Sequence, residues 1–220
     1  MKLGKGRPER RRDALNRRAI AQHALMLIDA DGLEALSMRK LGAVLGVEAM
    51  AMYHHYRNKA QLLDGVLELL IEEAEPPPAS QLTPLQRIRR CFENMRRLAI
   101  AHPQAFVLLP TRRFRTPPVL EFYERLLQNF ADAGFNAAQA ARYFRVLAGF
   151  VTGAGLAEIG SRAQQPDATP VILENFSDAA RFPRVTEVVP HLRVAKLEAI
   201  FTFGLDLIFA AMASELSGER

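Results

Sequence analysis

Helical spacing of apolar residues along nearly the whole chain is the feature that most restricts its fold. From about residue 13 to residue 31, apolar side chains recur every three to five positions. Similar runs follow at about 37–45, 48–55, 58–70, 84–101, 117–133, 137–161 and 190–214. No useful length of sequence alternates apolar and polar residues as a half-buried strand does. With 220 residues, 49% of them hydrophobic, the chain can bury a large core, and we expect an all-α protein.

Proline and glycine divide the chain into three parts. Residues 1–12, "MKLGKGRPERRR", lack apolar periodicity and are expected to form a flexible basic arm. The stretch "AEPPPASQLTP" at 74–84 predicts a boundary between a helical domain at 13–75 and a larger helical domain at 76–220. No apolar segment follows the arm as it would in a signal peptide, so we expect a cytoplasmic protein.

The positive charge is concentrated at one end of the chain. Residues 1–60 hold 12 Lys and Arg against 6 Asp and Glu, a surplus of six, whereas the remaining 160 residues hold 17 against 18. This asymmetry favours an anionic partner for the N-terminal quarter, with nucleic acid ahead of a membrane surface. A solvated basic tail without a partner is the alternative.

Two short helical segments in this basic quarter are separated by a turn containing glycine. Ser37 is a plausible N-cap for the first segment, and "LGV" at 45–47 ends it. This spacing is typical of a helix-turn-helix, which places its second helix in the DNA major groove. Arg39 could donate two hydrogen bonds to guanine. Tyr53, His55 and Lys59 carry donors suited to phosphate oxygens.

The same stretch, "SMRKLGAVLGVEAMAMYHHYRNKAQLLD" at 37–64, resembles the DNA-binding domain of the TetR-type repressors. The resemblance implies that Arg39 contacts a base and that Tyr53, His55 and Lys59 mainly contact phosphates. Tyr56 is expected to pack inward. Ala49 and Met50 stand where the tetracycline repressor has a Gln-Pro-Thr run, and they could contact thymine methyl groups but make no paired hydrogen bonds. The operator should therefore differ. The predicted DNA-binding set is Ser37, Arg39, Ala49, Met50, Tyr53, His55 and Lys59.

The larger domain is similar to the ligand-binding domain of the tetracycline repressor branch. The resemblance lies in "AHPQAFVLLPTRR" (101–113), "FADAGFNAAQAARYFRVLAGFVTGAGLAE" (130–158) and "AIFTFGLDLIFAAM" (199–212). Many of its aromatic residues must be core, but some are expected to line a pocket, with Asn94, His102 and Arg112 as polar candidates whose surface or capping roles are equally open. The predicted pocket set is Phe92, Asn94, Met95, His102, Phe106, Leu108, Arg112, Phe144 and Phe150.

The resemblance also bears on metal binding. The tetracycline repressor takes its drug together with magnesium, which imidazoles and a carboxylate surround. In this chain Leu108 and Phe150 stand where the two imidazoles would be, and of this set only Glu158 remains. Leu and Phe offer no lone pair to a cation that demands oxygen ligands. We therefore expect no metal and no cofactor, and a small apolar or aromatic effector.

Two helices of this domain have the composition of an interface. The run at 197–216 is apolar on two faces, with a narrow polar stripe at Glu198, Thr202 and Asp206, whereas Gly149 and Gly153 share a face of the run at 137–161. By resemblance, these helices form a four-helix bundle with a second subunit, giving a homodimer. A fully intramolecular core is the alternative. The acidic residues in a span of marginal length argue against membrane insertion.

An enzyme is not expected. The chain has no P-loop, no dinucleotide-binding glycine pattern after a strand and no zinc-protease motif, and its lone Cys91 is interpreted as a small core residue. We expect a homodimeric, ligand-responsive transcriptional regulator, most simply a repressor, although an activator would carry the same helices. The alternatives are a constitutive DNA-binding protein whose second domain only dimerises, and a non-specific architectural DNA binder, which would leave the large neutral domain unexplained.

Overall fold

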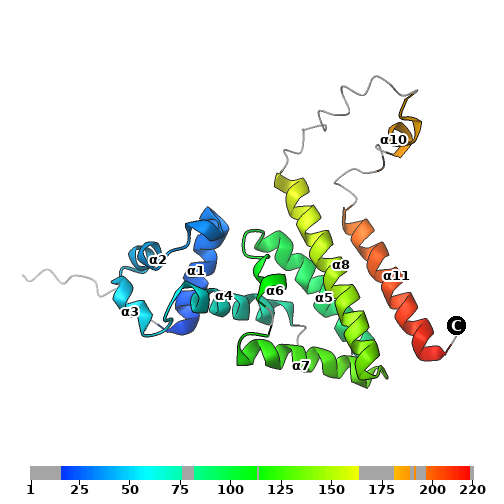
Figure 1. Cartoon of the computed structure of the whole chain (residues 1–220), viewed down its shortest axis with the longest axis horizontal. Coiled ribbons are helices and arrows are strands. Elements are labelled where there is room, and N and C mark those ends of the chain that lie inside the picture. The colour runs from blue at the N-terminus through cyan, green and yellow to red at the C-terminus, as the bar shows by residue number, and fades with distance from the viewer. Residues whose placement is uncertain are drawn as a thin grey trace, which may run out of the picture. The chain divides into compact units, whose positions relative to one another are not determined.

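The computed structural model describes residues 16–75, 82–112, 114–163, 181–188, 191 and 197–218, and within these ranges every regular element is a helix (Figure 1). The all-α prediction is therefore confirmed. The basic arm predicted at 1–12 lies outside the described residues. The elements are α1 (Arg17–Asp31), the 3₁₀ turn η1 (Leu33–Ala35), α2 (Met38–Leu45), α3 (Ala49–Tyr53), α4 (Lys59–Ala74), α5 (Pro84–Ala101), α6 (Leu108–Thr111), α7 (Pro117–Asp132), α8 (Ala137–Ala163), α10 (Pro183–Val188) and α11 (Leu197–Ser217).

The chain forms two compact units, Met1–Leu69 and Leu70–Arg220. The division falls inside α4, a few residues before the boundary expected at residue 75 from the proline-rich stretch. A helix that belongs to both units has no break in its apolar pattern, so the sequence does not reveal this position. Each unit is considered by itself below.

In the first unit, side-chain caps fix where the helices begin. Asn16 accepts a hydrogen bond from the amide of Ala19 at the start of α1, over 2.8 Å. Ser37 does the same for α2 by accepting from the amide of Lys40 over 3.1 Å, which confirms it as the predicted N-cap. The core of this unit is apolar and largely inaccessible to solvent; it includes Ile20, Ala24, Ile28, Leu36, Leu41, Met52, Leu62, Val66 and Leu67.

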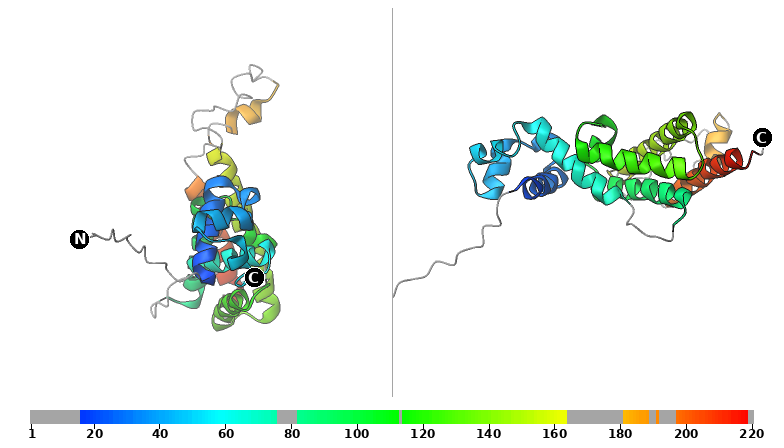
Figure 2. Two further views of the ribbon diagram at one scale, coloured as in Figure 1. Left: turned by 90° about the vertical axis from the view of Figure 1, so that its left-hand side faces the viewer. Right: turned by 90° about the horizontal axis from the view of Figure 1, so that it is seen from below.

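The second unit is a packed group of long helices. Helix α5 packs on α7 and α8, and α11 lies along α8 (Figures 1 and 2). Thr83 and Gln86 form a reciprocal capping box at the start of α5, with Pro84 in its first turn. The buried side chains include Ile88, Phe92, Ala105, Phe106, Val119, Phe130, Leu147, Leu205 and Met212.

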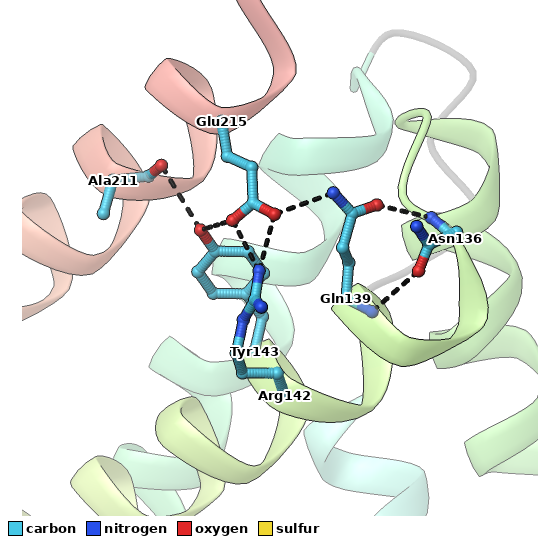
Figure 3. Close-up of polar contacts among 6 residues, drawn as sticks. All are labelled: Asn136, Gln139, Arg142, Tyr143, Ala211 and Glu215. Carbon is cyan, nitrogen blue, oxygen red and sulfur yellow. Dashed lines mark hydrogen bonds and ion pairs between the residues drawn. The ribbon is translucent and has the colours of Figure 1, made fainter. Parts of the chain in front are cut away.

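A polar clasp joins α8 to the end of α11 (Figure 3). The carboxylate of Glu215 accepts hydrogen bonds from the Tyr143 hydroxyl over 2.6 Å, from Gln139 over 2.7 Å and from Arg142. These three donors hold the pKa of Glu215 at about 2, well below its ordinary value. The clasp fixes the register of one helix against the other.

The helix boundaries agree with the sequence pattern where the pattern is long. Helix α5 has the predicted limits, and α7 and α8 differ from the prediction by one or two residues. The described last helix is Leu197–Ser217, and most of the stretch before it, where its start was predicted near residue 190, lies outside the described residues. The one-turn α6 and the short α10 were not predicted, since helices of four and six residues are too short for apolar periodicity to be recognised.

Candidate DNA-binding surface and ligand cavity

The turn between α2 and α3 is built around one glycine. Gly46 adopts a left-handed conformation with φ 66° and ψ 30°, which glycine tolerates without steric cost. Its amide donates to Ala43, and the amide of Val47 donates to Gly42 over 3.0 Å, so the last carbonyls of α2 are satisfied. This tight reversal lets α3 pack against α2, as a helix-turn-helix requires.

The side chains predicted to contact bases and phosphates are largely exposed. Met50 on α3 is 69% exposed, an unusual position for a large apolar side chain, and Tyr53 is 42% exposed. Arg39 and Ser37 are exposed near the start of α2, and His55 is half-buried after α3. Ala49 is the first residue of α3. The contrast with fully buried Met52 shows that α3 has one face in the core and one face open to solvent.

Tyr56 connects the end of α3 to the start of α1. Its ring is 1% exposed, as predicted, and its hydroxyl donates to the carbonyl of Arg17 over 2.9 Å. The Arg17 guanidinium lies 4.3 Å from the centre of this ring and donates to the carbonyl of His55. Burial is the main cause that raises the pKa of Tyr56, so the phenol stays protonated. These contacts hold the end of α3 in place.

Lys59 has a contact that its sequence position did not reveal. Its ammonium group donates to the carbonyl of Leu33 in the 3₁₀ turn, over 3.3 Å. One hydrogen bond leaves two donors of an ammonium group for other acceptors, so the contact is compatible with the predicted phosphate role. Asn58 precedes α4, and its side-chain oxygen accepts a hydrogen bond from the amide of Gln61 over 2.9 Å.

A small cavity of about 20 Å³, partly open to solvent, lies among α5, α6, α7 and α8 of the second unit. This volume holds about one water molecule. The wall is almost wholly apolar, and two hydroxyl groups, those of Tyr123 and Thr152, belong to its lining side chains. The lining comprises Met95, Phe106, Leu109, Pro110, Tyr123, Phe144, Ala148, Val151 and Thr152.

The predicted pocket residues divide into two groups. Met95, Phe106 and Phe144 line the cavity, whereas the other six are not among its lining residues. Among these, Phe92 and Leu108 are buried core, Arg112 is half-buried after α6 and Phe150 stacks on Phe201 at 5.5 Å. Asn94 donates to the carbonyl of Ala74 over 3.2 Å, and His102 lies 3.4 Å from the carboxylate of Glu73.

The lining residues that sequence reasoning missed are small or lie on a short helix. Leu109 and Pro110 belong to the unpredicted α6, and Ala148, Val151 and Thr152 face the cavity from α8. Tyr123 of α7 also lines the cavity and was not among the predicted pocket residues. Nothing in an ordinary apolar helical repeat distinguishes a cavity wall from core.

Glu158, the carboxylate in the region matched to the metal site of the tetracycline repressor, is already paired. It is 3% exposed and accepts two hydrogen bonds from Arg96, over 2.9 and 3.0 Å, and a third from Arg162 over 3.1 Å. A carboxylate surrounded by two guanidinium groups has little capacity left for a cation. Among the described residues, no group of three or more His, Cys, Asp and Glu side chains could hold a metal ion.

One face of α8 and one face of α11 are apolar and open to solvent. Phe203 and Leu207 on α11 are 63% and 57% exposed. At Gly149 and Gly153 on α8, no atom of the described chain beyond their own stretch of helix lies within 4 Å of where a side chain would begin. Helix α11 is also the one helix in the described ranges that is long and apolar enough to cross a membrane. Its exposed Asp206 pairs with Arg89 over 2.7 Å. We name these exposed faces together the α8–α11 surface; it also includes Val146, Leu156 and Ile200.

Comparison with known protein families matches both units. Residues 20–66 match the family described as bacterial regulatory proteins, tetR family. Residues 80–216 match the tetracyclin repressor-like C-terminal domain. Together these matches cover the helix-turn-helix and all the helices around the cavity.

Individual relatives agree with this assignment. An HTH-type transcriptional regulator of Saccharopolyspora erythraea is 31% identical over 213 residues, covering 94% of this chain and 90% of the relative. The class E tetracycline repressor protein of Escherichia coli is 28% identical, covering 90% of each chain. Among solved structures, the TetR family protein ActR of Streptomyces coelicolor in complex with (S)-DNPA is 25% identical, with a TM-score of 0.70 over 94% of this chain and 99% of that one.

Proposed function

The chain belongs to the TetR family of transcriptional regulators, a family of non-enzymatic DNA-binding proteins, and we propose that it is a cytoplasmic repressor released from DNA by a small apolar or aromatic effector. It binds a pseudo-palindromic operator as a homodimer. In this proposal residues 13–75 contact DNA and residues 76–220 bind the effector and dimerise. The observation that carries the proposal is a helix-turn-helix with one face open to solvent, in the same chain as a domain with a cavity of mostly apolar lining.

The α8–α11 surface supports dimerisation. Soluble monomers rarely expose several large apolar side chains along neighbouring helices. The open glycine positions on α8 would let a second helix approach closely, as the tight packing of small residues permits. A second copy of the chain presents the same surface and satisfies both helices at once, which is the geometry of a two-fold interface.

Sedimentation tests this step with a matched pair of substitutions. The wild type should sediment as a dimer at micromolar concentration, and Gly153→Leu should shift it towards monomer because the added side chain separates the helices. Ala131→Leu, on an exposed face of α7, should leave the dimer intact. A wild-type monomer under these conditions, or recovery of the protein in the membrane fraction, would contradict this use of the surface.

The lining of the cavity supports an effector without a metal ion. Its rings and aliphatic side chains would suit an apolar or aromatic molecule, with the hydroxyls of Tyr123 and Thr152 as its nearest polar partners. The class E relative is a tetracycline repressor by name, but in this chain Arg96 and Arg162 occupy the carboxylate of Glu158. We therefore expect a different effector from the tetracycline–magnesium complex.

Calorimetry and operator release provide the test. An effector drawn from apolar and aromatic compounds should release the protein from its operator equally well with and without EDTA. Tetracycline with magnesium should neither bind at micromolar affinity nor release the DNA. Since an effector acts only through its differential affinity for the two states, a compound that binds without weakening DNA affinity would favour a constitutive DNA-binding protein.

A further inference from the structure

The cavity as it stands is too small for any organic effector. A volume of about 20 Å³ accommodates one water, so the wall must move before a ring can enter. Five of the nine lining side chains are buried, and the other four are half-buried. The side chains that can move at least cost are therefore those at the surface that touch the lining from outside.

Phe114 is such a side chain. It follows α6 and is 52% exposed, although its ring lies only 4.5 Å from the ring of Tyr123, centre to centre. The rings of Tyr123 and Phe144 lie nearly perpendicular at 5.6 Å, centre to centre, and both residues line the cavity. Three aromatic rings thus form a row from the surface to the cavity, with the outermost ring half in solvent.

The backbone of Phe114 is strained as well. Its φ of 58° makes it the one non-glycine residue with positive φ in the described ranges. A bulky side chain in the left-handed region raises the free energy of the closed arrangement, and such residues concentrate at ligand clamps and switch segments. Exposure and strain at the same residue both lower the cost of removing this ring from Tyr123.

We propose that the ring of Phe114 covers Tyr123 where an aromatic ring of the effector binds, and that a planar aromatic ligand enters by displacing Phe114. This inference rests on the proposed function for the ligand's role as an effector. The displacement of Phe114 involves only this chain and can be measured without DNA. The ligand class is a planar aromatic, because Phe114 leaves a site in which one aromatic ring already packs on another, tilted by 41° at 4.5 Å. It is neutral because the cavity lining holds no charged side chain.

Thiol labelling measures this opening directly. Ala148→Cys places a thiol in the cavity wall, and the native Cys91 provides a quiet background because burial raises its pKa and it is 1% exposed. The reagent is 4,4′-dithiodipyridine, with the wild-type rate subtracted. Phe114→Ala should speed labelling of Cys at position 148 by roughly two- to tenfold, the range of an aromatic pair contact. Phe114→Leu, which keeps an apolar side chain, should also speed it.

Leu120→Ala is the matched control, since Leu120 is exposed on α7 and does not line the cavity. It should leave the labelling rate unchanged. As a ligand probe, 2-naphthol should slow labelling more in Phe114→Ala than in the parent, whereas its saturated counterpart decahydro-2-naphthol should not. The proposal would be overturned if the labelling rate were the same with and without the Phe114 ring, or if Leu120→Ala raised it as much as Phe114→Ala. Equal protection by the saturated alcohol and by 2-naphthol would also overturn it. No DNA is present, so failure here is distinct from failure of operator binding or release.

Discussion

The hydroxyl of Tyr56 donates a hydrogen bond to the main-chain carbonyl of Arg17, joining residues 39 positions apart in the sequence. Gly65 on α4 makes this possible, because a methyl group there would lie 2.3 Å from the Tyr56 hydroxyl oxygen. The position of α3 therefore depends on a glycine of α4. This relation connects packing inside the first unit to the geometry of its DNA-binding face.

Gly65→Ala should destabilise the first unit. Overpacking of this kind costs about 1–3 kcal/mol, which exceeds the gain of roughly 1 kcal/mol that alanine brings to a helix interior. Amide hydrogen exchange in α1 should become faster. Gly160→Ala on α8, where nothing lies within 4 Å, serves as the control and should leave α1 unchanged. Unchanged exchange in α1 of Gly65→Ala would mean that the Tyr56 ring can move without loss.

Substitutions at Arg39 and at Lys59 should affect DNA binding differently, because we expect Arg39 to contact a base and Lys59 to contact a phosphate. Arg39→Ala should lose roughly 1–3 kcal/mol of operator affinity and relax the preference at one base position. Lys59→Gln should weaken all sequences alike and reduce the salt slope by about one. Glutamine can still donate to the Leu33 carbonyl, so the local turn is preserved. Equal, sequence-independent losses in both variants would make Arg39 a phosphate contact instead.

The fold was predictable from the sequence where apolar periodicity is long and capped. Helix α5 has the limits predicted from its apolar repeat, with the Thr83 capping box and Pro84 at its start, and the inward position of Tyr56 was also predicted. The cavity wall was predictable only in part. Asn94 and His102 were predicted to orient a ligand, but the pattern could not show that Ala74 and Glu73 would be their partners, because those contacts depend on where α4 ends against α5.

Substitutions at the buried pair of Arg96 and Glu158 should destabilise the fold strongly only when they remove one partner and leave the other charge unpaired. Glu158→Ala would leave a guanidinium in a site where the Arg96 side chain is 11% exposed, and breaking such a pair costs about 3–5 kcal/mol. The double substitution Arg96→Met with Glu158→Leu should be much closer to wild type, since it removes both charges. Denaturant unfolding measures both. A single variant as stable as wild type would show that solvent already screens the pair.

The clasp at Glu215 should make stability depend on pH in acid. Its folded pKa of about 2 lies below the unfolded value of about 4.3, so the carboxylate stabilises the fold above about pH 4.3. This contribution is lost as the pH falls towards 2. Glu215→Gln should therefore be less stable than wild type at pH 7, with the difference shrinking below about pH 4. Glu187→Gln, at an exposed pair with Arg184, is the control and should track wild type throughout.

Selection of bound duplexes from a randomised pool, followed by footprinting of the enriched site, tests the central claim most directly. The account predicts enrichment of one pseudo-palindrome, protected as two half-sites separated by one helical turn, about 34–36 Å, or a multiple of it. Arg39→Ala should enrich a less defined site at one position of each half. Uniform protection without any enriched sequence would contradict the account.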